Sequence, residues 1–438
     1  MLGNGLAIVF AVVTAGIAVQ AIFNIRLRLF IWEDPERARL NRAPKTYRAP
    51  ELTFTILLPA RHEQDVFRET IQKIHDINYP RELVQIVAIC REDDQETISE
   101  ALAKIGELGD PRLQLLVFND KPINKPHGLN LGLSVAEGDV VTIFDAEDEP
   151  HRDILNIVNT ILADGDVDAV QSGVQLMNYN TRWFCFLNVL EYFFWFKSSL
   201  HFFARIGMIP LGGNTVFVRR ELIEQLGGWD EHCLTEDADL GIRLSVGGAR
   251  IRVIYDDAFV TREETPSSIG QFVKQRTRWN QGFIQVLLKG DWLGLETFTQ
   301  RGLAFYVLVM PELQALFGLL VPFSVASIFF IHVQLWIAMF TFLPLACLIL
   351  SIFIELAGLH EFKKAHGAAW SWREAGVLVL SFFPYQWVLG FSALRAVYRH
   401  IKGALDWEKT AHLGQHRELA PAGVHSRVGR EAEVPRPA

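Results

Sequence analysis

This 438-residue sequence has few cysteines, few glycine-rich loops and no net positive charge. No Walker-type or dinucleotide-type glycine pattern follows any predicted strand, which argues against a P-loop nucleoside triphosphatase and a Rossmann dehydrogenase. The net charge of -8 argues against nucleic acid as a partner. The cysteines show no paired spacing, so neither a disulfide framework nor a zinc site is indicated; they are Cys90, Cys185, Cys233 and Cys347.

Basic residues are also missing from the first five positions, before an uncharged apolar run over residues 6–25. Because a secretory signal peptide begins with a basic region, this run is favoured as a retained membrane anchor over a cleaved signal. Its length of about 20 residues is sufficient to cross a bilayer. Cytoplasmic flanks are rich in Lys and Arg, so the basic residues after the run place the next region in the cytosol; they are Arg26, Arg28, Arg37, Arg39 and Arg42.

Three more apolar blocks lie at residues 303–331, 334–356 and 375–394, which gives about four predicted transmembrane helices. Prolines inside these blocks predict kinks. Three spans after a cytosolic domain would put the C-terminal tail outside, whereas the basic residues that flank the last block favour the inside. Either the segment with Pro311 and Glu312 or the segment with Pro384 is interfacial or re-entrant, or the tail breaks the rule.

The expected organisation is an N-terminal transmembrane helix (1–30), a cytosolic domain (45–295), a C-terminal transmembrane region (301–400) and a tail (401–438). From Gln415 the tail mixes Arg, Glu, Pro and Gly without apolar periodicity, which predicts that it is largely disordered.

The middle of the chain alternates short apolar runs with amphipathic stretches. The runs LTFTILLPA, LVQIVAICR, LQLLVF and VVTIFDAED are predicted strands, and the stretches between them are predicted helices. Strands separated by helices of this length imply right-handed crossovers and a mostly parallel sheet with both faces covered. The predicted fold class is therefore α/β, of a nucleotide-binding type.

Charged side chains gather where the predicted strands end, which is the edge at which ligands of such sheets bind. Without a glycine-rich loop, a diphosphate needs another source of positive charge, and carboxylates holding Mg²⁺ or Mn²⁺ would provide it. Asp145, Glu147 and Asp148 in DAED fit that role. The alternative is that DAED begins a helix, and that LTEDADLGIRL likewise holds only helix-capping acids.

The stretch QRTRWNQG, residues 275–282, places two arginines and a tryptophan just before the first C-terminal apolar block. On a helix, Gln275, Arg278 and Trp279 share one face. By itself the stretch is also typical of an interfacial helix with an aromatic anchor and snorkelling arginines.

In chain order the motifs are PARHE, REDD, NKPHGLNLGL, DAED, LGGN, TEDADL and QRTRW. This order resembles the membrane-bound glycosyltransferases of family 2, inverting enzymes that include cellulose, hyaluronan and chitin synthases and related glycolipid-forming enzymes. The resemblance covers roughly residues 50–290. It implies a GT-A-type nucleotide-binding sheet, accompanied by interfacial helices and transmembrane helices.

For the donor, the resemblance implies that the nucleotide lies by Ala60 and Glu63, with Asp93 or Asp94 near the base and ribose. Lys125 would lie near the phosphates as a point charge.

The family's metal motif is usually Asp-x-Asp, and here it reads Asp145-Ala-Glu147 with Asp148 next to it. Asp145 is thus the expected ligand of Mg²⁺ or Mn²⁺ beside the diphosphate, and either Glu147 or Asp148 is the second.

For the reaction, the resemblance implies that Asp237 is the general base and that Glu236 orients. Arg278 would grip the leaving diphosphate by two hydrogen bonds, and Trp279 would stack on a sugar ring next to Gln275.

The resemblance also places Gly213 and Asn214 by the acceptor. The aromatic-rich segment 182–207 is predicted to be a second interfacial helix, and WEKTAH, 407–412, a gate or packing element.

The sequence thus predicts a multi-pass inner-membrane enzyme that moves a sugar from a nucleoside diphosphate, UDP by preference, to a saccharide or lipid acceptor at the cytosolic face. Polymer synthesis with export is favoured over single transfer to a lipid, and a homo-oligomer or partner would complete the export path. The alternative from another class is a membrane-anchored scaffold that binds nucleotide sugar without turnover. A transporter is disfavoured, because its ionisable residues should lie inside the spans.

Overall fold

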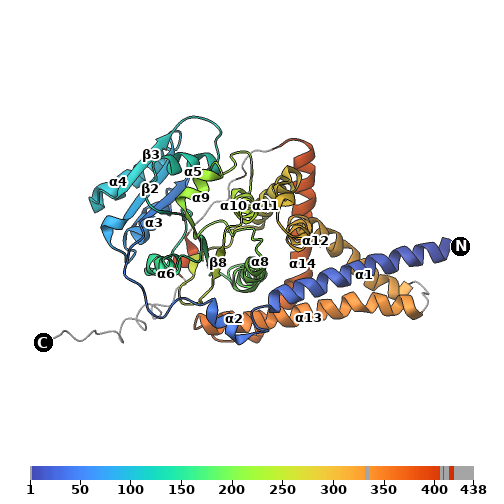
Figure 1. The fold of residues 1–438 in the computed structure, drawn as a ribbon. Helices are drawn as coiled ribbons and strands as arrows, with labels where there is room; N and C mark the ends of the chain where they lie inside the picture. The colour runs from blue at the N-terminus through green and yellow to red at the C-terminus, as the bar shows by residue number, and fades with distance from the viewer. Residues whose placement is uncertain (1, 331–334, 405–407, 409–413, 419–438) are drawn as a thin grey trace.

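A seven-stranded sheet forms the centre of the middle region, in the order β3-β2-β1-β4-β7-β5-β8 (Figure 1). Neighbouring strands run parallel, except that β7 is antiparallel to β4 and β5. A second, two-stranded sheet pairs β6 with β9. The predicted mostly parallel α/β sheet is therefore confirmed. The strands are β1 (Phe54–Ala60), β2 (Val84–Arg91), β3 (Leu113–Phe118), β4 (Val140–Ile143), β5 (Ala169–Ser172), β6 (Val174–Leu176), β7 (Val216–Arg219), β8 (Ile251–Ile254) and β9 (Thr261–Glu263).

The structure is a computed structural model that describes residues 2–330, 335–404, 408 and 414–418. Helices cover both faces of the large sheet because successive side chains of its strands point to opposite sides. In β1, Ile56 packs in a core with Phe67 of α3, whereas Leu57 packs in a second core with Leu129 of α5. The helices of this region are α3 (Phe67–His75), α4 (Gln95–Leu108), α5 (Lys125–Ser134), α6 (Ile154–Leu162), α9 (Arg220–Gln225) and α10 (Glu236–Val246).

Long helices from both ends of the chain pack beside this sheet domain. In Figure 1, α1 and α13 run side by side away from the sheet. Helix α14 packs on both α11 and α12. These helices are α1 (Leu2–Leu29), α11 (Ile269–Lys289), α12 (Phe298–Phe330), α13 (Leu335–Ala365) and α14 (Trp372–Ile401).

The aromatic-rich segment predicted as an interfacial helix forms α7 (Cys185–Phe194), one π-helical stretch (Trp195–Ser199) and α8 (Leu200–Ile206). Helix α7 contacts β6, α13 and α14, so it lies between the sheets and the C-terminal helices. Phe193 and Leu200 are fully buried there. The segment is a packed layer of the fold, and its contact with a membrane interface stays a prediction.

Two helical segments among the described residues are long and apolar enough to cross a membrane, Leu343–Ala365 and Trp372–Ile401. They correspond to two of the four predicted spans. The other two, 6–25 and 303–331, lie largely within α1 and α12, parts of which fall outside the residues whose side chains are described. A count of four therefore stays a prediction.

The acidic loop after β4 does not begin a helix. Asp145 to Asp148 form a turn, and α6 starts only at Ile154. At the second acidic motif, α10 does begin at Glu236, but the side chain of Thr235 makes no capping hydrogen bond. Helix-capping therefore explains neither motif completely, and both acid clusters remain available for a site.

Part of the tail predicted to be disordered is ordered. Residues 415–418 form the short helix α15 (Gln415–Glu418), which is held against α3 and the loop after β4. In WEKTAH, only Glu408 is described, and it pairs with Arg395 of α14 at 2.6 Å. Trp407 and residues 409–412 lie outside the described residues, as does the rest of the tail after 418.

Candidate active site

A cavity of about 790 Å³ opens where β1 and β4 end and where α10 starts. The carboxyl ends of the strands in an open α/β sheet are where ligands collect. The cavity continues between α1, α12, α13 and α14, each of which contributes lining residues. All the predicted site residues line it except Asp93, Asp94 and Asp148.

One lysine brings the two acidic motifs together. The Nζ atom of Lys125, at the start of α5, lies 2.6 Å from Oδ1 of Asp145 and 3.5 Å from Oε1 of Glu236. Burial opposes the charge of Lys125, but the two carboxylates outweigh this and raise its pKa. The loop after β4 and the start of α10 therefore face the same point in the cavity.

Asp237 lies partly buried next to this point. Burial and the neighbouring Glu236 raise the pKa of Asp237 to about 7. The backbone of Gly213 passes close by with a left-handed φ of 92°, and a Cβ atom there would lie 3.5 Å from Oδ2 of Asp237. A carboxylate with this pKa can take up a proton near neutral pH.

The DAED loop presents only some of its acids to the cavity. Asp145 and Glu147 line it, whereas Asp148 is wholly buried behind them. The oxygens of Asp148 accept hydrogen bonds from Nδ2 of Asn214, each at 2.8 Å, and from the Asp145 amide. Burial, followed by the charges of Asp145, Glu263 and Glu147, raises the pKa of Asp148 well above its usual value. Asp148 thus fixes the loop, and Glu147 is the second acid on the cavity wall.

Asp93 and Asp94 lie at the end of β2 but outside the cavity lining. Asp94 is buried and caps α4 by accepting from the amide of Thr97, and it also accepts from the amide of His62. Burial opposes its charge, but these hydrogen bonds outweigh it and lower the pKa of Asp94. Asp93 is half exposed and pairs with Arg91. A contact of either acid with the base or ribose stays a prediction.

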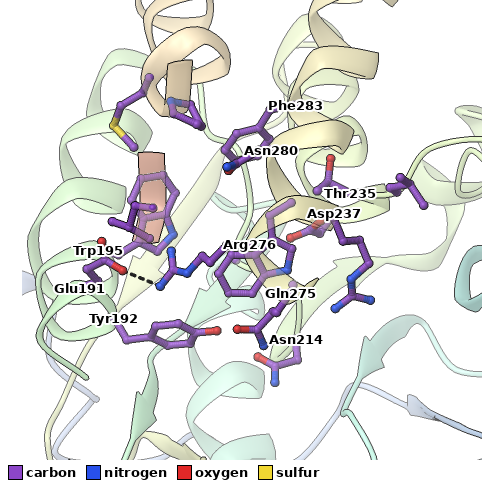
Figure 2. Close-up of a pocket in the computed structure, with 18 of the residues that line it drawn as sticks. Glu191, Tyr192, Trp195, Asn214, Thr235, Asp237, Gln275, Arg276, Asn280 and Phe283 are labelled. Atoms are coloured by element: carbon purple, nitrogen blue, oxygen red, sulfur yellow. Dashed lines mark hydrogen bonds and ion pairs between the residues drawn. The ribbon is translucent and has the colours of Figure 1, made fainter. Parts of the chain in front are cut away.

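Helix α11 carries the QRTRWNQG motif along one wall of the cavity. Gln275, Arg278 and Trp279 all line it, as their shared helical face predicts. In Figure 2, Gln275 lies near Asn214 and Asp237. The guanidinium of Arg276 lies 4.8 Å from the centre of the Trp279 ring. One face of the indole is therefore already covered, and only the rest of its surface could receive a sugar.

Arg278 is the motif's cation at the acid cluster. Its side chain is partly buried, and desolvation lowers its pKa, while the charges of Glu236, Asp145, Asp237 and Glu147 act in the opposite direction. Arg278 and Lys125 therefore bring two partly buried cations to one group of carboxylates. A site with this balance can hold both an anionic ligand and a metal ion.

Gly282 sets the distance between α11 and the start of α10. A Cβ atom at this position would lie 2.4 Å from Oγ1 of Thr235 and 2.7 Å from its backbone nitrogen.

We expect Gly282→Ala to force the helices apart and to destabilise the fold by about 1–3 kcal/mol, as overpacking does. Thermal unfolding in detergent measures this. The matched control is Gly106→Ala in α4, where a Cβ meets nothing within 4 Å and we expect a gain of about 0.5–1 kcal/mol. An unchanged melting temperature in Gly282→Ala would contradict the packing argument.

The sequence prediction missed cavity residues on α7. Glu191 and Tyr192 both line the cavity, and Glu191 forms an ion pair with Arg276 (Figure 2). Glu191 also accepts a hydrogen bond from the hydroxyl of Tyr385. Glu263, at the end of β9, also lines it. The available signal was the single acid inside an otherwise aromatic helical stretch, because a charge there needs a buried partner.

Comparison with known proteins agrees with this geometry. A family model described as "Glycosyltransferase like family 2" matches residues 50–282. The probable glycosyltransferase YdaM of Bacillus subtilis is 26% identical over 388 residues, which cover 83% of this chain and 87% of that protein. A beta-monoglucosyldiacylglycerol synthase of Trichormus variabilis is 26% identical over 53% of this chain and 49% of its own length. A poly-beta-1,6-N-acetyl-D-glucosamine synthase of Staphylococcus aureus is 24% identical over 63% of this chain and 65% of its own.

Among solved structures, the chain is similar to the mannosyltransferase PcManGT from Pyrobaculum calidifontis, solved in complex with GDP-Man and Mn²⁺. The TM-score is 0.56 at 19% identity, over 90% of this chain and 99% of that one, which shows a common GT-A-type fold. The family model covers more than half of the chain, from the first strand of the sheet to the end of the QRTRWNQG motif. The chain therefore belongs to glycosyltransferase family 2 and is a nucleotide-sugar-dependent glycosyltransferase.

Proposed function

We propose that the protein transfers a sugar, with inversion, from a UDP-sugar to a saccharide or lipid acceptor at the cytosolic face of the inner membrane. The observation that carries this is the contact of Lys125 with both Asp145 and Glu236, in a cavity that Asp237 and Arg278 also line. A cation for the diphosphate, a base for the acceptor and a guanidinium for the leaving group thereby surround one space.

The acid cluster fits a divalent cation. Within the described residues, no three acid, His or Cys side chains are grouped so that they could hold a metal ion alone. Mg²⁺ and Mn²⁺ at such sites need only one or two carboxylates, because substrate phosphates supply further ligands. The raised pKa of Asp148 reflects an excess of negative charge from Asp145, Glu147 and Glu263, after burial, and a cation would relieve it. Asp145 and Glu147 would hold the metal, which would neutralise charge on the departing diphosphate.

The transfer itself depends on two groups of the chain. Asp237 takes the proton of the acceptor hydroxyl as that oxygen forms its bond to the anomeric carbon. The bond from that carbon to the diphosphate oxygen breaks on the opposite face, so the configuration inverts. Arg278 offers a planar pair of donors to the diphosphate as it gains charge. Gly213 and Asn214 border the space beside Asp237, where the acceptor would lie.

The acceptor would enter between the helices. The cavity is lined by Gln20 and Asn24 of α1, Gln314 of α12 and Gln386 of α14, together with apolar side chains. Such a mixed lining suits a sugar chain or a lipid with a sugar headgroup. Relatives named for polymer synthesis and for glycolipid synthesis both match this chain, and we favour a polymer, with a homo-oligomer or partner completing the export path.

The direct test is transfer in membranes that contain the protein. Radiolabelled UDP-sugars, with a GDP-sugar as comparison, are supplied with Mn²⁺, and label is followed into lipid and high-mass fractions. We expect one UDP-sugar to label a product and EDTA to abolish the labelling. A product from the GDP-sugar alone would overturn the choice of nucleotide, and no product from any donor, with nucleotide binding retained, would favour the scaffold.

The rate should depend on pH through Asp237. Because its pKa is raised to about 7, the carboxylate is ionised, and thus able to act as a base, only above about pH 7 in the free protein. We expect kcat/KM to fall about tenfold per pH unit below pH 7 and to level off above it. Initial rates measure this at fixed, saturating Mn²⁺ between pH 5.5 and 8.5, limits that lie about 1.5 units on either side of the pKa of Asp237. A flat profile across that range would argue against Asp237 as the base.

A further inference from the structure

The last described segment of the chain lies against the acidic loop of the site. The short helix α15 lies at the start of a stretch whose composition predicts disorder, yet the side chain of His416 is fully buried and that of Arg417 is only 9% exposed. We call Gly414, His416 and Arg417 the C-terminal anchor. Burial of a charged side chain requires partners, so its contacts show what it does.

Arg417 reaches the backbone of the DAED loop. Its Nη2 donates to the carbonyl of Glu147 at 3.2 Å and to Oγ1 of Thr70 at 2.6 Å. The hydroxyl of Thr70 in turn donates to the carbonyl of Ala146 at 2.5 Å. The carbonyls of the two residues that follow Asp145 are therefore held by one connected set of hydrogen bonds.

Further contacts fix Arg417 and the anchor in this position. The Nη1 atom of Arg417 donates to the carbonyl of Val66 and to the carboxylate of Glu69, each at 3.2 Å. The amide of Gly414 donates to Oε1 of Glu264 at 3.1 Å, with φ at 68°, a conformation that glycine adopts without strain. The anchor is thus attached to α3 on one side and to the chain after β9 on the other.

Other contacts hold different parts of the same loop. Glu149 forms a backbone bridge with Arg262 and an ion pair with Lys73 at 2.9 Å. Asp148 is held by Asn214. These act on Asp148 and Glu149, whereas Arg417 acts on the carbonyl of Glu147 and, through Thr70, on that of Ala146, so the peptides on both sides of Glu147 are held.

We propose that Arg417 is a positioning residue. By holding the carbonyl of Glu147, it directs the Asp145 and Glu147 carboxylates towards the divalent metal ion that would accompany the donor diphosphate. This inference rests on the proposed function for the identity of that cation. The hydrogen bonds from a guanidinium are charge-assisted and stronger than neutral ones, so their loss frees the loop without removing a ligand. Arg417 acts through the loop and touches no reacting group.

Amide hydrogen exchange of the full-length protein in detergent tests the positioning directly. In Arg417→Ala, we expect the amides of Asp148 and Glu149 to exchange about tenfold faster, as the loss of one charge-assisted hydrogen bond allows. The matched control is Arg68→Ala on α3, the helix that Arg417 contacts; it removes an arginine paired with Glu107 on the surface and should leave loop exchange unchanged. Equal loop exchange in wild type and Arg417→Ala would overturn the proposal.

Binding of UDP and of GDP, titrated with Mn²⁺, supplies the second readout. We expect Arg417→Ala to raise the Mn²⁺ midpoint about tenfold, with binding restored at saturating Mn²⁺, and Arg417→Lys to be intermediate. Loss of binding even at saturating Mn²⁺ would mean a general structural role and would overturn the proposal. If neither nucleotide binds to the wild type, the donor assignment fails, while faster loop exchange would still support the positioning.

Truncation tests whether the anchor, and not the tail after it, is what holds the loop. Deletion of residues 419–438 keeps the anchor and should leave both readouts unchanged, whereas deletion of 415–438 should reproduce the effects of Arg417→Ala. Identical behaviour of the two truncations would contradict the proposal.

Discussion

Asp237→Asn is expected to lower turnover by about 10²–10⁴-fold while donor binding stays close to that of the wild type. The amide keeps the size and the hydrogen-bonding ability of the side chain but cannot accept the proton of the acceptor hydroxyl. In the proposed site, donor binding would depend on Lys125, Arg278 and the loop after β4, all of which line the cavity and stay in place in the variant. Turnover is measured by product formation at saturating donor, and binding by titration with UDP and Mn²⁺.

The same substitution should stabilise the fold at neutral to alkaline pH. The pKa of Asp237 is raised from 3.8 to about 7, so the folded state binds this proton more tightly than the unfolded state. Stability from this group is therefore present at low pH and lost as the pH rises from about 4 to 7. Above pH 7, Asn avoids the cost of the buried charge, and we expect a melting temperature a few degrees higher.

Asp239→Asn is the matched control on the same helix. Asp239 is also buried, but it pairs with Arg243 and Lys289, each at 2.7 Å, and does not line the cavity. We expect a lower melting temperature with turnover retained at a temperature where the variant is folded. Full turnover in Asp237→Asn would exclude it as the base, whatever its stability.

Arg278→Ala should lower turnover by about 10²–10³-fold, the usual cost of removing one preorganised group from a developing charge. Arg278 is partly buried, and the charges of Glu236, Asp145, Asp237 and Glu147 act on it. Arg278→Lys should recover only part of the rate, because an ammonium lacks the planar pair of donors that matches a diphosphate. Single-turnover rates at saturating donor measure the chemical step.

Arg276, two residues earlier in the same motif, provides the contrast. It pairs with Glu191 and lies over the ring of Trp279, so its loss leaves a largely buried acid without this ion pair. We expect Arg276→Ala to lower the melting temperature by several degrees, because breaking a buried ion pair is strongly destabilising. If Arg278→Ala lowered stability as much as Arg276→Ala and left the rate per folded molecule unchanged, Arg278 would be structural.

Most strands and helices of the sheet domain could be predicted from the local sequence. Residues 54–60 and 84–91 are short apolar runs bounded by polar residues, and the stretches between such runs have helical periodicity. Both signals depend on neighbouring residues, so no tertiary information is needed to interpret them. The antiparallel insertion of β7 between β4 and β5 is different, because a four-residue strand shows no sign of which strands it will pair with.

The orientation of single acids in the site could not be predicted in this way. In DAED, Glu147 and Asp148 are adjacent, and the sequence did not decide which of them is the second metal ligand. Asn214, far along the chain, donates hydrogen bonds to both carboxylate oxygens of Asp148, and Asp148 does not line the cavity. Asp94 similarly becomes a helix cap because the amides of His62 and Thr97 reach it. Adjacent acids in a loop differ only in the partners that the fold brings to them.

The sequence by itself determined the α/β architecture, the order of the acidic motifs and the helical face shared by Gln275, Arg278 and Trp279, because each depends on spacing along the chain. The tertiary structure alone decided that Lys125 joins the two acidic motifs, that Glu147 rather than Asp148 lines the cavity, and that Arg417 holds the DAED loop. These are hydrogen bonds and ion pairs between distant segments, and they form only when folding fixes the distance and direction between the groups.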